Sequence, residues 1–189
     1  NNVFWAIVNG NLVEMKLSHR KLQHVRSLEP RRAFSDLFFI DTMRGWACGR
    51  DGIIFATTDG GKHWNRQTSN TNIELRQIRF SDKNFGWAIG RENRDGNFLS
   101  IFLITKDGGK TWRQEVLQEA ESFISASFVS GFVGCVLVGL ETTYCTNGGR
   151  SWKLTPIENK NLSDIAFVSR NIGYAVGDTI SKTTDGGKS

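Results

Sequence analysis

The chain has 189 residues, of which 39% are hydrophobic and 11% aromatic, with 20 glycines and only 2 prolines. This composition is typical of a globular domain with enough apolar material for a sizeable core. The formal net charge of +5 is mild and scattered along the chain, so it favours an ordinary solvated surface over a dedicated site for nucleic acid or anionic lipid.

In chain order, the pattern begins with a unit at residues 1–30 that is only partly preserved. Apolar runs at 3–8 and 12–17 flank Asn9-Gly10, a pair that strongly favours a tight hairpin turn. Residues 21–28 are predicted as the return strand, although 22–28 are also a weak candidate for a helix.

The next three predicted units each hold four short strands joined by turns rich in Gly and Asp, an order typical of an antiparallel meander. They cover residues 33–68, 73–118 and 122–158, and a partial fifth unit with three strands covers 161–189. The unit at 73–118 is longer because 91–97 adds a polar stretch, which we expect to be a solvent-exposed loop. Matching apolar pairs in the first strands predict one buried face that recurs between units: Leu37/Phe39, Ile78/Phe80 and Ile165/Phe167.

One uncharged stretch, residues 123–140, has 18 residues and reaches the nominal length of a membrane helix. It contains three Ser and three Gly and falls in register with the other strand pairs, so we expect strands and no transmembrane span. The chain has three cysteines, an odd number that argues against a full disulfide framework. Cys135 and Cys145 flank a predicted turn; they are either bonded across it or small buried hydrophobic residues.

A repeated octapeptide organises these units. Its first copy, at 57–64, reads Thr-Thr-Asp-Gly-Gly-Lys-His-Trp, and its Asp, or Asn in one copy, recurs at 107, 147 and 185, giving intervals of 48, 40 and 38 residues. Asp followed by Gly-Gly predicts a tight turn between two strands, because Gly accepts a positive φ without steric cost. The Asp can accept from nearby backbone N–H groups, the Thr can add a bond, and the Trp begins the return strand. A structural role is therefore predicted for Thr57, Asp59, Gly61, Trp64, Thr105, Asp107, Gly109, Trp112, Asn147, Gly149, Trp152, Thr183, Asp185 and Gly187.

The octapeptide matches the Asp-box, or bacterial neuraminidase repeat, and four-stranded units of about 40 residues are the blades of a β-propeller. With the recurring Gly-Trp/Tyr-Ala-x-Gly at 45–49, 86–90 and 173–177, the chain resembles the photosystem II stability/assembly factor family from residue 33 onward. The resemblance implies an all-β fold: one seven-bladed propeller, of which residues 1–189 form a fragment of about four to five blades. It also implies export to a lumen, a periplasm or the cell surface, no enzyme activity and no cofactor.

The resemblance further implies a protein partner, because family members in oxygenic phototrophs bind a photosystem II reaction-centre subunit through a basic surface. Arg50 and Arg91 follow Gly-Trp-Ala-x-Gly at the same place in consecutive units, so we expect them on one face. Arg76 and Arg79 lie on a predicted innermost strand, facing a channel or its mouth. Because arginine suits bidentate recognition of carboxylates, these four are the candidate partner-binding site of a monomeric scaffold; the alternative is ordinary solvated arginines.

A glycoside hydrolase is the alternative function, since Asp-boxes also occur in sialidases and some glucan hydrolases. A sialidase needs an arginine triad and a tyrosine nucleophile, and other glycosidases need a suitably spaced carboxylate pair. Tyr144 and Tyr174 occupy repeat positions that indicate packing, and no carboxylate stands out, so this alternative places the catalytic residues in further blades. Nucleic-acid binding is not expected, because the repeat accounts for the aromatic residues. No metal site is expected either, since His19, His24 and His63 are scattered.

Overall fold

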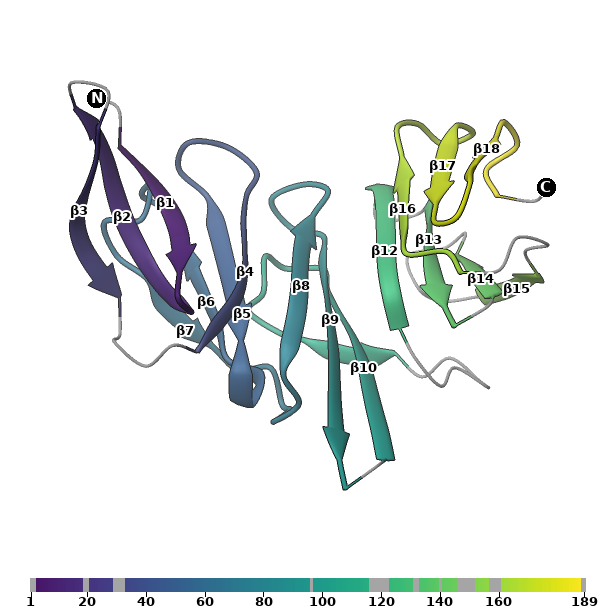
Figure 1. The fold of residues 1–189 in the computed structure, drawn as a ribbon, viewed down its shortest axis with the longest axis horizontal. Coiled ribbons are helices and arrows are strands. Elements are labelled where there is room, and N and C mark those ends of the chain that lie inside the picture. Colours follow the sequence, from purple (N-terminus) through teal and green to yellow (C-terminus); the bar gives the residue numbers. More distant parts are fainter. Residues whose placement is uncertain are drawn as a thin grey trace.

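The computed structural model describes residues 3–18, 21–28, 33–95, 97–115, 123–130, 133–139, 141–145, 152–156 and 161–187. These residues form five antiparallel sheets, each built from strands that are consecutive in the sequence. Figure 1 shows the sheets following one another along an arc, and we number them 1 to 5 in chain order. The fold is therefore all-β and built from successive propeller-like blades, as predicted.

Sheets 2, 3 and 4 have four strands each, and their strand order follows the chain. Sheet 2 comprises β4 (Phe34–Phe39), β5 (Gly45–Gly49), β6 (Ile54–Thr57) and β7 (Asn65–Gln67), with the short 3-10 turn η1 (Arg50–Gly52) after β5. Sheet 3 comprises β8 (Leu75–Phe80), β9 (Gly86–Arg94), β10 (Asn97–Thr105) and β11 (Arg113–Glu115). Sheet 4 comprises β12 (Phe123–Ser130), β13 (Val133–Val138), β14 (Glu141–Cys145) and β15 (Trp152–Pro156).

Sheets 1 and 5 have three strands each: β1 (Val3–Val8), β2 (Asn11–Ser18) and β3 (Lys21–Leu28), and β16 (Asp164–Phe167), β17 (Gly173–Val176) and β18 (Ile180–Thr183). The Trp5 indole N–H in β1 donates to the Gly60 carbonyl at 3.2 Å, just as the Trp46 indole in β5 donates to the Gly108 carbonyl at 3.2 Å. β1 therefore corresponds to the second strand of a four-stranded sheet. In sheet 5, β17 carries the same Gly-aromatic-Ala pattern as β5, so it also corresponds to a second strand. Sheets 1 and 5 therefore each include strands that correspond to the second and third strands of a four-stranded sheet.

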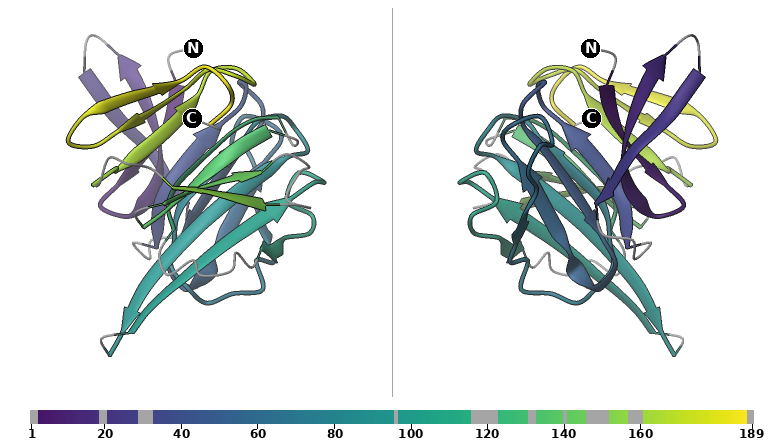
Figure 2. Two further views of the ribbon diagram at one scale, coloured as in Figure 1. Left: turned by 90° about the vertical axis from the view of Figure 1, so that its right-hand side faces the viewer. Right: turned by 90° about the vertical axis from the view of Figure 1, so that its left-hand side faces the viewer.

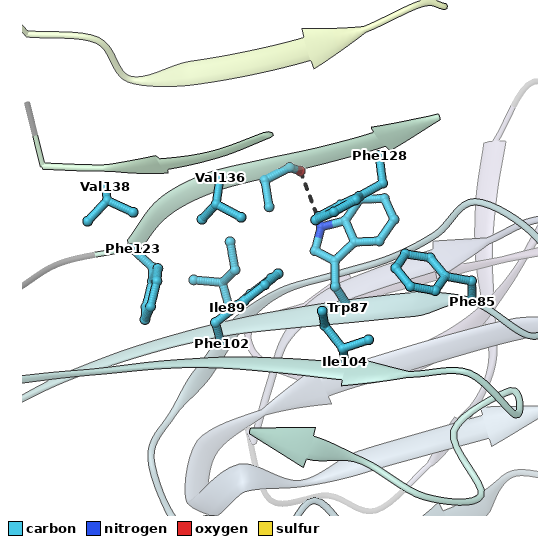
Figure 3. Close-up of a cluster of buried hydrophobic side chains, with 10 residues drawn as sticks. Phe85, Trp87, Ile89, Phe102, Ile104, Phe123, Phe128, Val136 and Val138 are labelled. Atoms are coloured by element: carbon cyan, nitrogen blue, oxygen red, sulfur yellow. Dashed lines mark hydrogen bonds between the residues drawn. The ribbon is translucent and has the colours of Figure 1, made fainter. Parts of the chain in front are cut away.

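Apolar clusters fill the spaces between neighbouring sheets and hold the sheets face to face. Between sheets 2 and 3, Trp46 stacks on Phe80 with ring centroids 3.5 Å apart. Between sheets 3 and 4, the Trp87 indole N–H donates to the Ala126 carbonyl at 3.2 Å, the dashed line in Figure 3. This second cluster contains Phe85, Trp87, Ile89, Phe102, Ile104, Phe123, Ala126, Phe128, Val136 and Val138. Burial of these side chains is the main stabilising contribution at each joint.

The prediction of a loop at residues 91–97 is wrong. β9 continues to Arg94 and β10 begins at Asn97, so the polar stretch belongs to paired strands. Asp95 has a left-handed φ of 53°, which suits the two-residue Asp-Gly turn that the sequence contains here. The strand pairing satisfies the backbone even though the side chains are polar, and the resulting hairpin projects beyond the other sheets (Figure 2).

Two further expectations have outcomes in the described residues, and a third does not. The segment 21–28 forms β3, which confirms the predicted strand and rules out the weak helical alternative. Most of the uncharged stretch forms β12 and β13, and none of the helical residues described makes a segment long and apolar enough to cross a membrane. Cys135 is buried and pairs in register with Tyr144, while the side chain of Cys145 lies outside the described part of the chain, so the choice between a disulfide and two buried thiols stays untested.

Candidate functional site

The Asp-box turns share one set of hydrogen bonds in the described residues. The Thr57 hydroxyl donates to Asp59 Oδ1 at 2.9 Å and accepts from the Gly61 N–H at 2.9 Å, and Asp59 Oδ1 also accepts from the His63 N–H at 3.0 Å. The two Thr bonds recur at 2.8 and 2.8 Å among Thr105, Asp107 and Gly109, and at 2.8 and 2.9 Å among Thr183, Asp185 and Gly187. Trp64, Trp112 and Trp152 pack against the apolar clusters, whereas Asn147 and Gly149 lie outside the described residues.

Hydrogen bonds lower the pKa of two box carboxylates, Asp59 and Asp107. The backbone N–H of His63, its imidazole at 2.6 Å and the Thr57 hydroxyl hold the pKa of Asp59 far below its usual range. Burial would raise the pKa of Asp107, but hydrogen bonds from Thr111 and Thr105 outweigh it and lower that pKa. A carboxylate that resists protonation in this way suits the closing of a turn and not general acid catalysis.

Three of the four arginines that sequence analysis selected meet at one cavity. Arg76, Arg79 and Arg91 line a space of about 340 Å³ where sheets 2, 3 and 4 approach one another. We call it the arginine cavity; its other lining residues are Asp36 from β4, Gln77 from β8, Ile89 and Gly90 from β9, and Phe123 and Ile124 from β12. The lining combines three guanidinium groups and one carboxylate with an apolar wall supplied mainly by sheet 4.

Ion pairs fix two of these arginines in place. Arg79 pairs with Asp36, which also accepts from the Ile78 N–H at 2.8 Å and so joins β4 to β8. The Arg76 guanidinium contacts the Glu74 carboxylate at 3.0 and 3.2 Å, and its side chain is 51% exposed. Both guanidiniums keep further N–H donors, because an arginine has five and each pairing uses only some of them.

Arg50 and Arg91 occupy equivalent backbone positions, but only Arg91 lines the arginine cavity. The Arg50 N–H donates to the Ala33 carbonyl at 2.7 Å and the Arg91 N–H donates to the Glu74 carbonyl at 3.0 Å, each just before an inner strand. The glycine before Arg50 is required here, because a Cβ on Gly49 would lie 1.7 Å from the Ala33 oxygen. The repeat thus aligns the two backbones, but Arg50 belongs to sheet 2 and Arg91 to sheet 3.

Sequence reasoning missed several residues that line the cavity. Gln77 has a buried Oε1 with no hydrogen-bond partner among the described residues, and Phe123 is 6% exposed. In the sequence, Phe123 gives only the signal of a core position. Gln77 occupies the position that Asp36 holds in the preceding inner strand. This change from a carboxylate to an amide within the repeat was the sequence signal that could have identified Gln77.

Three cavities of the described residues each contain a single carboxylate residue and no carboxylate pair. The arginine cavity contains Asp36, a second space of about 690 Å³ contains Asp51, and a third of about 260 Å³ beside β8 and β12 contains Asp164, one carboxylate residue each. In the described residues, no three His, Cys, Asp or Glu side chains group as metal ligands. Tyr174, interpreted from the sequence as a packing residue, is 38% exposed and lies under the Lys182 ammonium.

The chain matches the family model described as photosynthesis system II assembly factor YCF48 over residues 1–101. It is 30% identical over 130 residues to the photosystem II assembly lipoprotein Ycf48 of Synechococcus sp. (strain CC9902). The aligned region covers 62% of this chain and 35% of that protein. The chain therefore spans only part of that relative's length.

Two solved structures illustrate the likeness in fold. YCF48 bound to a D1 peptide aligns with a TM-score of 0.60 at 21% identity, over 79% of this chain and 49% of that one. An ancestral GH74 enzyme aligns with a TM-score of 0.63 at 16% identity, over 82% of this chain and 23% of that one. At such identities the alignments show the shared propeller fold and do not distinguish a binding protein from an enzyme.

Proposed function

Because the chain belongs to the photosystem II assembly factor YCF48 family, we propose that it is a non-enzymatic scaffold that binds a protein partner. In this proposal the arginine cavity receives a carboxylate-bearing segment of the partner, which is a subunit of a membrane complex. The observation that carries the proposal is the meeting of Arg76, Arg79 and Arg91 at one cavity.

The chemistry of the lining supports a peptide as the ligand. Guanidinium groups bind carboxylates through paired N–H donors, and Arg76 and Arg79 keep donors beyond those used in their ion pairs with Glu74 and Asp36. Phe123 and Ile124 offer an apolar wall for a neighbouring side chain. An acidic residue or a chain terminus next to an apolar residue fits this combination.

The test measures binding of a D1 peptide, the ligand of the solved YCF48 relative, by calorimetry with the wild type and charge-reversed variants. We expect Arg76→Glu and Arg91→Glu each to weaken binding about tenfold or more, because each removes a charge-assisted hydrogen bond. Lys83→Glu is the matched control, since Lys83 is exposed in the loop after β8 and does not line the cavity. Unchanged affinity in the Arg76→Glu/Arg91→Glu double variant would overturn the proposal.

Arg50→Glu separates two versions of this idea. If the partner contacts only the arginine cavity, Arg50→Glu binds like the wild type. If the partner extends to sheet 2 and contacts the repeat-equivalent Arg50, the variant weakens binding as well. A pull-down from a solubilised membrane extract with the same variants then identifies the native subunit.

A glycoside hydrolase is the second candidate, favoured by the likeness to the GH74 fold. Against it, two of the three carboxylates that line these cavities are engaged: Asp36 with Arg79, and Asp164 with the Ser125 hydroxyl at 2.6 Å. Hydrolysis of a glucan or a sialoside by the purified protein would overturn the non-enzymatic assignment. We also propose that the protein is an exported monomer; the Synechococcus relative is described as a lipoprotein, which supports export.

A further inference from the structure

One polar position recurs in three consecutive inner strands: Asp36 in β4, Gln77 in β8 and Ser125 in β12, each directly after a register shift. At two of the three places the side chain joins its sheet to the next one. Asp36 Oδ2 accepts from the Ile78 N–H of sheet 3 at 2.8 Å, and the Ser125 hydroxyl donates to Asp164 Oδ1 of sheet 5 at 2.6 Å. The repeat therefore uses this position for a hydrogen bond between neighbouring sheets.

Gln77 departs from this rule. Its Oε1 is buried, and it has no hydrogen-bond partner in the part of the chain that the structure describes. A buried acceptor without a partner is unfavourable, because it has lost water and gained nothing in exchange. A ligand N–H that reaches this oxygen therefore forms a hydrogen bond without displacing one between the sheets.

The Gln77 side chain lies between two cavities. Together with Arg79 it lines both the arginine cavity and the third cavity, the space of about 260 Å³ beside β8 and β12. We call this second space the neutral cavity. A chain that occupies both cavities has to pass the Gln77 amide.

The neutral cavity offers both donors and acceptors without an excess of charge. Among its lining residues the charged ones are Arg79 and Asp164, one of each sign. Asp164 Oδ1 accepts from the Ser125 hydroxyl and the Ile165 N–H, which leaves Oδ2 as an acceptor. Ser127 Oγ accepts from the Phe167 N–H at 2.9 Å, which leaves its proton as a donor. This combination suits a neutral peptide group, whereas the arginine cavity suits a carboxylate.

We propose that Gln77 recognises the main chain of the bound segment. Its Oε1 accepts from a backbone N–H close to the carboxylate that the arginine cavity holds, and the segment continues into the neutral cavity. This inference rests on the proposed function and adds to it that the ligand is an extended peptide, recognised through its backbone as well as its carboxylate. A small carboxylate that fills only the arginine cavity lacks this contact.

The test measures binding of the D1 peptide and of copies in which one backbone amide at a time is replaced by an ester, which removes a single N–H and keeps every side chain. With the wild type, one ester position should weaken binding about fivefold, the effect of losing one hydrogen bond. With Gln77→Leu the same ester should bind as well as the unmodified peptide. Gln114→Leu is the matched control, because Gln114 is exposed on β11 and lines neither cavity; it should keep the wild-type pattern.

An ester that weakens binding equally in the wild type and in Gln77→Leu, or an ester series without any effect, would overturn this inference. A second measurement uses only the wild type: the side-chain amide resonances of Gln77 should shift when the peptide binds, and unchanged resonances would refute the contact. In either case, peptide binding that still depends on Arg76 and Arg91 leaves the proposed function standing. A peptide that does not bind the wild type overturns both.

Discussion

The substitution Thr105→Val tests whether the Asp-box hydroxyl stabilises the fold. Thr105 is 1% exposed; its hydroxyl donates to Asp107 Oδ1 at 2.8 Å and accepts from the Gly109 N–H at 2.8 Å. Valine keeps the shape but removes both bonds, and the Gly109 N–H is then buried without a partner. Losing the hydrogen bonds and stranding that donor should lower the free energy of unfolding by about 2–4 kcal/mol.

Urea unfolding followed by tryptophan fluorescence gives this difference directly. Thr111→Val is the matched control, because the exposed Thr111 hydroxyl bonds to the same carboxylate, at Asp107 Oδ2, 2.6 Å away. An exposed position of this kind should change stability by no more than about 0.5 kcal/mol. Equal effects from the two substitutions would refute the reasoning, because burial of the hydroxyl would then contribute nothing.

Two further predictions concern the first Asp-box. Gly61→Ala should lower the melting temperature far more than Gly139→Ala: both have positive φ, but a Cβ on Gly61 would lie 2.0 Å from Trp5 Nε1, whereas one on Gly139 meets nothing within 4 Å. Similar losses in the two variants would show that backbone strain alone matters. Asp59 has a lowered pKa, chiefly through the His63 N–H, so its contribution is present above the ordinary value of 3.8 and is lost as pH falls below it. Melting curves of Asp59→Asn should therefore show a weaker loss of stability in acid than the wild type, and an unchanged acid profile would contradict this.

The repeat explains why so much of the architecture was predictable. A turn such as Thr57-Thr-Asp59-Gly-Gly61 is closed by atoms within a few residues, so the sequence alone determines its geometry. Successive turns then set the order of the strands in each sheet. The error at residues 91–97 arose because polar composition was given more weight than the Asp95-Gly96 turn signal, which joins two paired strands.

The functional residues were only partly predictable, because local sequence pattern selects single residues but does not determine how the sheets pack. Arg76, Arg79 and Arg91 could be selected from strand position and repeat alignment, since these depend on local pattern. Their meeting with Phe123 depends on how sheets 3 and 4 pack, and Phe123 carries no sequence signal beyond that of a core residue. Arg50, at the equivalent place in sheet 2, is not among the residues that line the cavity, although its place in the repeat is the same as that of Arg91.

By itself, the sequence determined the all-β fold and the position of each Asp-box, because short-range hydrogen bonds and alternating apolar residues specify strands and turns locally. The tertiary structure alone decided which side chains share a joint. It placed three arginines at one cavity, and it left the buried Gln77 Oε1 without the bond between sheets that Asp36 and Ser125 make. Contacts between sheets depend on packing across the chain, and the environment that packing creates sets the charge and hydrogen-bonding capacity of each buried group.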